Sequence, residues 1–290
     1  MHSIYPSIES LVEDCTRWDY SEDKIPSGCA HAYSIAKFGY DRYNAHGIDK
    51  EIAILRNPPD EFGRVMHSQE CMLSTETFKK RRWRIVRRRP YGCRADIGRI
   101  LEGDMERCWI TFGRSHVDIP AVRIFVSIGG NHNIGREEMS VCGATACSIC
   151  EILESNGIAV EIWAACNFKA RLFRKKNKDP VDMVTMFKVK PTNEYIDYSR
   201  LAHITGSAGF YRTFIWLSRI RCAMRNGINP IFSKSSSMSF GKEHMPDAMY
   251  GDIDLERTIF IPRIYSTCEA KTWIRDNIEN MHMTGGVVAA

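Results

Sequence analysis

The sequence predicts an α/β fold in which helices cover both faces of a mostly parallel sheet, giving three layers. The first observation is Val122–Ile128, a continuous apolar run rich in β-branched residues, typical of a central strand buried on both faces. The second is the order of the next segments: a glycine-rich turn at Gly129–Gly135, a helical pattern over Gly135–Asn156 and another buried strand at Ile158–Ala164. Together they form a strand–helix–strand unit, whose two strands we expect to be parallel with a right-handed crossover.

The other elements are predicted from local signals in chain order. Residues 1–60 are typical of short helices and turns, with a candidate helix between Gly28 and Gly47 and a break at Asn57–Asp60. A short strand is expected at Ile110–Phe112. After the strand–helix–strand unit we expect a basic loop (Phe168–Pro180), a strand (Val181–Val189), a helical region interrupted near Gly206–Gly209 (Tyr195–Arg221), a long polar loop (Asn226–Asp254), a fourth strand (Arg257–Ile264) and a closing helix (Thr267–Met281).

The alternation of strands and helices begins only after about residue 115. We therefore predict three parts: an N-terminal α+β flank over residues 1–115 that carries a basic segment at 79–89, an α/β domain over residues 116–284, and a disordered tail over residues 285–290.

Composition narrows the class of protein. The chain has 290 residues, of which 44% are hydrophobic and 26% charged, and a net charge of +5, as expected for an ordinary soluble globular protein. No apolar run is long enough for a membrane helix, and the first residues have no signal-peptide core. The eleven cysteines form an odd number without a disulfide framework, which favours reduced thiols and a cytoplasmic location. We predict no membrane association.

Three cysteines have a spacing that permits two interpretations. Cys142, Cys147 and Cys150 reproduce the spacing of plant-type iron–sulfur ligands. They also lie within the helical pattern, where Cys142 and Cys147 would project about 140° apart. On that interpretation the cysteines act as small hydrophobes that let the helix lie close to the sheet.

The strongest charge signal is Lys79–Arg89, with eight cations in eleven residues and an interleaved Trp83. Such a segment suits phosphates and stacked bases, and it equally suits a solvated or protein-facing surface. A second basic cluster lies at Arg171–Lys178. The candidate nucleic-acid residues are Lys79, Lys80, Arg81, Arg82, Trp83, Arg84, Arg87, Arg88, Arg89, Arg174, Lys175 and Lys176.

No motif identifies an enzyme or a cofactor. The turn Gly129–Gly135 either cradles a phosphate or is glycine-rich for backbone geometry, and its spacing matches no dinucleotide or P-loop motif. His116, His132 and His203 are isolated, and Cys166 is a candidate nucleophile for which the sequence names no partner. We therefore favour a non-enzymatic protein without a cofactor.

The strand–helix–strand block resembles the first part of a von Willebrand factor A-like domain, a Rossmann-like fold. That family ends its first strand in Asp-x-Ser-x-Ser, which binds a divalent cation. Here Gly129, Asn131 and Asn133 occupy the three places, and Thr205 is the weak match for a later threonine. The resemblance thus implies a degenerate site without metal, because neutral amides supply no charge to a hard cation.

A closer resemblance, over most of the chain, is to an uncharacterised phage and bacterial family with a degenerate A-like domain. It is carried by Ser27–Gly47, Gly92–Cys108, Cys142–Trp163 and Asp197–Arg219. It implies a phage or mobile-element adaptor in the host cytoplasm, partnered with an AAA+ ATPase. The alternative is a nucleic-acid-binding accessory protein for phage replication or transcription. The expected partner-binding residues are Asn131, His132, Asn133, Thr205 and Ser207.

Overall fold

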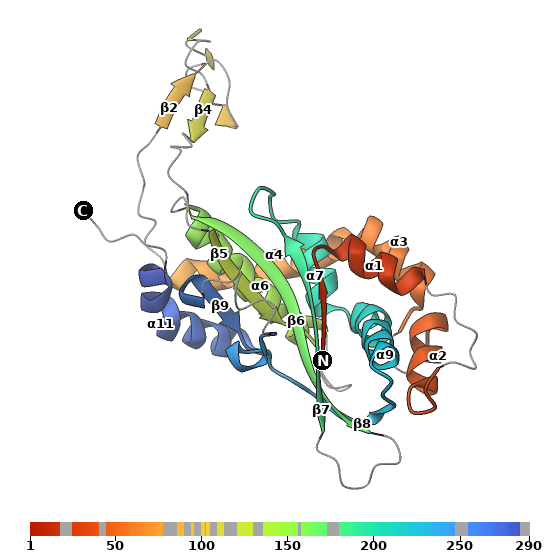
Figure 1. Cartoon of the computed structure of the whole chain (residues 1–290). Coiled ribbons are helices and arrows are strands. Elements are labelled where there is room, and N and C mark those ends of the chain that lie inside the picture. The colour runs from red at the N-terminus through yellow and green to blue at the C-terminus, as the bar shows by residue number, and fades with distance from the viewer. Residues whose placement is uncertain are drawn as a thin grey trace.

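The computed structural model is shown in Figure 1. It describes residues 1–17, 25–40, 45–77, 86–89, 94–95, 100–101, 103–104, 109–112, 121–129, 136–155, 158–172, 180–246 and 255–284.

A six-stranded mixed sheet forms the centre of the protein. Strand β5 (Ala121–Ser127) pairs in parallel with β6 (Ala159–Leu172) on one side and with β9 (Thr258–Ile261) on the other. The other edge of β6 carries β7 (Val181–Lys190), which is antiparallel to it, and β1 (His2–Tyr5) pairs in parallel with β7. The α/β class is confirmed, and three of the five described strand pairs of this sheet are parallel.

Strand β6 is longer than expected because it has two partners along one edge. Its first half lies beside β5, and its second half pairs with the antiparallel strand β8 (Pro230–Met238). The predicted basic loop from residue 168 was therefore wrong at its start, since the strand runs to Leu172. The predicted long loop from residue 226 was also wrong in part, since it contains β8.

Helices connect and cover these strands. Helix α6 (Arg136–Ser155) follows β5, and α7 (Tyr198–Gly206), α8 (Ala208–Phe210), a π-helical turn η3 (Tyr211–Ile215) and α9 (Trp216–Arg225) follow β7. Short 3-10 turns lie at Lys242–His244 and Leu255–Arg257. The remaining described helices are α1 (Ile8–Thr16), α2 (Ala30–Phe38), α3 (Ile48–Arg56), α4 (Asp60–Thr77) and α11 (Thr267–Thr284).

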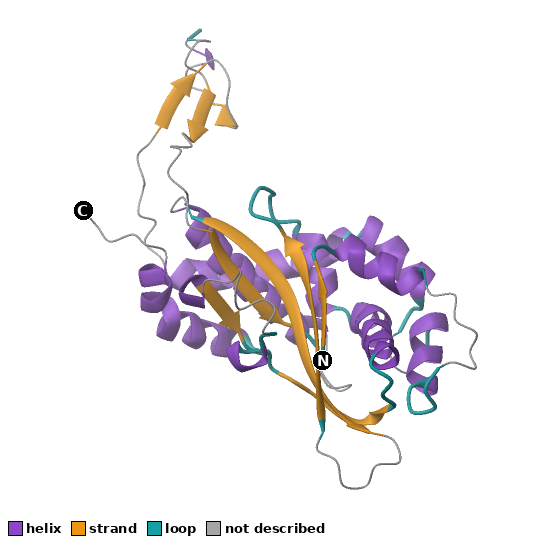
Figure 2. Ribbon diagram, in the orientation of Figure 1, coloured by secondary structure: helices purple, strands orange, loops and turns teal. Residues whose placement is uncertain are grey.

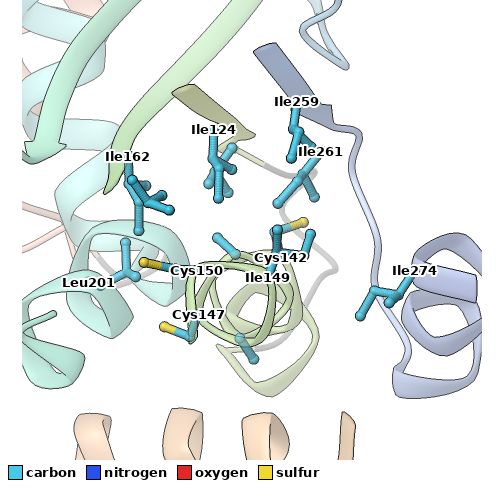
Figure 3. Packing of buried hydrophobic residues seen from close by; sticks show 14 of the residues in the cluster. Ile124, Cys142, Cys147, Ile149, Cys150, Ile162, Leu201, Ile259, Ile261 and Ile274 are labelled. Atoms are coloured by element: carbon cyan, nitrogen blue, oxygen red, sulfur yellow. The ribbon is translucent and has the colours of Figure 1, made fainter. Parts of the chain in front are cut away.

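One face of the sheet is buried by helices. Alternate residues of β5 and β6, such as Ile124 and Ile162, pack against α6, with α4, α7 and α11 around it. Figure 3 shows this packing, in which Cys142, Cys147 and Cys150 project from α6. Farther along the same face, Cys166 and Phe187 pack against α1, α2, η3 and α9. The three α6 cysteines are thus part of the core, as the hydrophobe interpretation requires.

The opposite face is buried differently. Phe125 and Trp163 lie there, and they pack against Phe240, Met245 and Leu255. None of these covering residues belongs to an α-helix. The predicted three-layer arrangement is therefore not found in the described chain, which has one helical layer and an irregular cover on the other face.

The N-terminal part of the chain shares the main sheet. Strand β1 pairs with β7, and Met66 of α4 packs in the same core cluster as α6. A second sheet lies apart from this body, as Figure 2 shows, and consists of β2 (Val86–Arg89), β4 (Trp109–Phe112) and β3 (Arg94–Ala95). The domain boundary at residue 115 stays a prediction, and the tail at 285–290 lies outside the described residues.

Candidate functional site

The predicted recognition edge begins where β5 ends. Ser127 is buried, and its hydroxyl accepts a hydrogen bond from the Phe240 amide (2.9 Å) and lies 3.3 Å from the Phe240 carbonyl. Gly129 follows with φ of 109°, a backbone conformation that favours glycine. These contacts connect the end of β5 to the segment around Phe240, which covers the opposite face of the sheet. Asn131, His132 and Asn133 lie outside the described residues.

The other two predicted partner-binding residues are buried. Thr205 is 2% exposed and lies in α7, where its hydroxyl donates to the Leu201 carbonyl at 2.8 Å and packs against Gly143 of α6. Ser207 caps the next turn by accepting from the Phe210 amide at 3.2 Å. Both hydroxyls thus have structural partners, and neither side chain forms part of an exposed recognition surface.

The described part of the chain holds no group of three or more His, Cys, Asp or Glu residues arranged for a metal ion. Its cysteines are free thiols, and burial raises the pKa of Cys142 to about 11 and the pKa of Cys147 well above the usual value. No described helix has the length and apolar character needed to cross a membrane.

In the small sheet, residues 87–89 at the end of the basic segment lie alternately on the two faces. Central strand β4 is antiparallel to both neighbours, with Arg89 and Ala95 opposite Trp109, and Arg87 opposite Thr111. Because alternate residues of a strand belong to opposite faces of its sheet, these five residues share one face. The other face holds Val86, Arg88, Arg94, Ile110 and Phe112.

Each face therefore holds two arginines and one aromatic residue, and the faces differ in their other members. These are Ala95 and Thr111 on the face of Trp109, and Val86 and Ile110 on the face of Phe112. Trp109 was missed by the sequence analysis, since only the pairing register brings it opposite Arg89. The remaining predicted nucleic-acid residues, Lys79–Arg84 and Arg174–Lys176, lie outside the described residues.

A buried carboxylate between two imidazoles was also missed. Glu51 of α3 is fully buried, and its two oxygens lie 2.6 Å from His46 Nδ1 and 2.8 Å from His203 Nε2. Gly209 lies so close that a Cβ there would come within 2.1 Å of Glu51 Oε1. His203 is thus a hydrogen-bonded core histidine.

A second cluster lies behind an open depression of about 510 Å³ between α4 and α7, lined partly by Arg64, His67 and Tyr198. Tyr198 donates to Glu151 at 3.0 Å, and His67 Nδ1 lies 3.1 Å from Glu70. Burial and the neighbouring Glu151 carboxylate raise the pKa of Glu70, whereas His67 opposes the rise. Protonation of Glu70 thus removes the repulsion between its carboxylate and that of Glu151.

The sequence matches the family described as "Domain of unknown function (DUF7192)" over residues 54–283. No curated protein matches the chain, and no solved structure does. The matched region covers the cluster around Glu70 and the two sheets apart from β1, whereas His46 and Glu51 of the other cluster precede it. The chain belongs to the DUF7192 family.

Proposed function

We propose that this protein binds single-stranded nucleic acid through the face of the small sheet that holds Arg87, Arg89 and Trp109. The observation that carries the proposal is the register, which brings two cationic residues and an aromatic one onto the same face. Proteins that bind single strands combine cations for the phosphates with aromatic platforms on which bases stack. Thr111 adds a hydroxyl to this face.

The separation of the two faces supports this assignment. The opposite face also holds two arginines, but its other members, Val86, Ile110 and Phe112, are apolar residues, so we assign the ligand to the face that combines its arginines with Trp109 and Thr111. Figure 1 draws the small sheet away from the main body, where a strand of nucleic acid can approach it. The net charge of +5 favours such an encounter.

The test is the salt dependence of binding to a fluorescently labelled single-stranded oligonucleotide, measured by anisotropy. Replacing Arg87 and Arg89 together by Gln removes two phosphate contacts, so the slope of log affinity against log salt should fall by about 1.4. Trp109→Ala should lose about 1–3 kcal/mol of stacking, a loss of roughly 5- to 150-fold in affinity.

Replacing Arg88 and Arg94 together by Gln is the matched control, because it removes two charges from the opposite face. This control should leave the slope within experimental error of the wild-type value. The proposal is wrong if the wild-type protein does not bind, if binding is insensitive to salt, or if the control weakens binding as much as the substitution of Arg87 and Arg89 does.

The predicted adaptor role is a second proposal, supported by the sequence resemblance alone. Its test is copurification from expressing cells. A stoichiometric AAA+ ATPase, together with no oligonucleotide binding, would favour the adaptor over the nucleic-acid-binding role.

A further inference from the structure

The depression between α4 and α7 combines charged, polar and aromatic residues in one place. Its volume is about 510 Å³, a size typical of sites for small molecules. The lining residues are Asp60, Gly63, Arg64, His67, Tyr198 and Ser199. All of them belong to the N-terminal part of α4 or to the start of α7, two helices that pack against each other. The lining is therefore held by regular structure.

Two residues of opposite charge line the depression without neutralising each other. Asp60 and Arg64 are one turn apart on α4, a spacing at which an acid and a base often pair. Both are exposed, and neither side chain forms a hydrogen bond or an ion pair in the part of the chain that the structure describes. A carboxylate and a guanidinium are thus both available to a ligand that carries the two complementary charges.

The two rings in the lining are fixed by polar contacts. The His67 and Tyr198 rings meet edge to face, with centroids 5.3 Å apart. The Tyr198 hydroxyl donates to Glu151 at 3.0 Å, and His67 Nδ1 lies 3.1 Å from Glu70. Because both rings are held in this way, they form a preformed surface for an apolar group beside the charged pair.

The close approach of the two helices places a hydroxyl in the same depression. A Cβ at Gly63 would come within 2.4 Å of Ser199 Oγ, so a larger residue at this position would displace the hydroxyl. The Ser199 hydroxyl has no hydrogen-bond partner among the described residues. It is a further polar group that a ligand can use.

We propose that this depression binds an α-amino acid with an apolar side chain, whose ammonium pairs with Asp60 and whose carboxylate pairs with Arg64. The two charged groups of an α-amino acid are attached to the same carbon, so one small molecule can reach two side chains that are one helical turn apart. The His67 and Tyr198 rings contact its apolar side chain. A simple anion such as phosphate fits less well, because the Asp60 carboxylate repels it.

The test is a titration of isotopically labelled full-length protein with L-phenylalanine, followed by the amide chemical shifts. The shifts should change in α4 and α7. N-Acetyl-L-phenylalanine lacks the ammonium and L-phenylalaninamide lacks the carboxylate, so each should bind about two- to fivefold more weakly, as expected for one exposed ion pair. Absence of binding, equal affinities for the three compounds, or shifts confined to other elements would overturn the proposal.

Substitutions then assign each charge. Asp60→Asn should abolish the preference for L-phenylalanine over its N-acetyl derivative, and Arg64→Gln should abolish the preference over the amide. Each preference is a ratio measured within one variant, so a change in stability does not affect it.

Matched controls change the same charges outside the depression. Glu61→Gln removes the other acidic residue of the first turn of α4, and Arg56→Gln removes an exposed arginine at the end of α3. Both controls should keep both preferences, and loss of either preference in a control contradicts the assignment. Tighter binding of inorganic phosphate than of L-phenylalanine, dependent on Arg64 but not on Asp60, would show an anion site instead. None of these measurements depends on the small sheet, so the result is independent of nucleic-acid binding.

Discussion

The contact between α6 and its neighbouring helices predicts a cost for the smallest possible enlargement, Gly143→Ala. A Cβ at this position would lie 2.4 Å from Thr205 Oγ1 and 2.5 Å from Met66 Cε, whereas ordinary contacts are 3.4–4 Å. Met66 can yield, because Cε is the end of a flexible side chain. Thr205 cannot easily do so, because it is β-branched and its hydroxyl is bonded to the Leu201 carbonyl.

The magnitude follows from three opposing contributions. Overpacking a well-packed core costs about 1–3 kcal/mol, and turning Thr205 away from its acceptor costs about 1 kcal/mol more. Alanine in place of glycine in a helix returns about 1 kcal/mol. We therefore expect Gly143→Ala to lower the free energy of unfolding by about 1–3 kcal/mol, the reverse of the usual gain.

Urea unfolding followed by circular dichroism measures this difference. The double variant Gly143→Ala, Thr205→Ala removes the hydroxyl from the contact, so the two costs should fall short of additivity by about 1 kcal/mol. The packing argument fails if Gly143→Ala unfolds at the same or higher urea concentration than the wild type, or if the two costs simply add.

Three other substitutions test the clusters and a helix cap. The pKa of Glu70 is raised in the folded protein, so its contribution to stability is complete below the pKa of an unfolded glutamate and is lost as pH rises through the folded value. Glu70→Gln should therefore raise the melting temperature at pH 8 but not at pH 4. The control Glu61→Gln, on the exposed side of α4, should have no such effect. Glu51→Ala should cost about 3 kcal/mol in urea unfolding, because it leaves two imidazoles without their shared partner; a loss under about 1 kcal/mol would contradict that role. Asp197→Ala should cost about 1 kcal/mol by removing the side-chain cap of α7, and an unchanged unfolding midpoint would show that the cap contributes nothing.

The strand–helix–strand unit was predictable because its signals are local. The apolar run before Gly129 and the glycine after Asn156 delimit β5, α6 and β6 without any information about distant residues. The length of β6 and the existence of β8 were not predictable, because they depend on pairing between residues about 60 to 70 apart in the chain. The Ser-rich composition of β8 also resembles that of a loop.

The sequence signal does not determine what covers each face of the sheet. An apolar run records that both faces of a strand are buried, but not which residues bury them. Phe125 and Trp163 are as buried as helix-covered residues, yet their cover is Phe240 and Met245 from an irregular segment. For the sites, residue types could be read from the sequence, but partners such as Glu51 for His203 required the fold.

The pairing of β1 with β7 has a consequence for synthesis on the ribosome. His2 aligns with Val184, so the two partners are about 180 residues apart in the chain. At the usual elongation rate of about 5–20 residues per second, the first strand waits on the order of 10–40 s before its neighbour emerges. During that interval Tyr5 and the apolar side of α1 have no sheet to cover them, so this end of the chain stays exposed until β7 has been made.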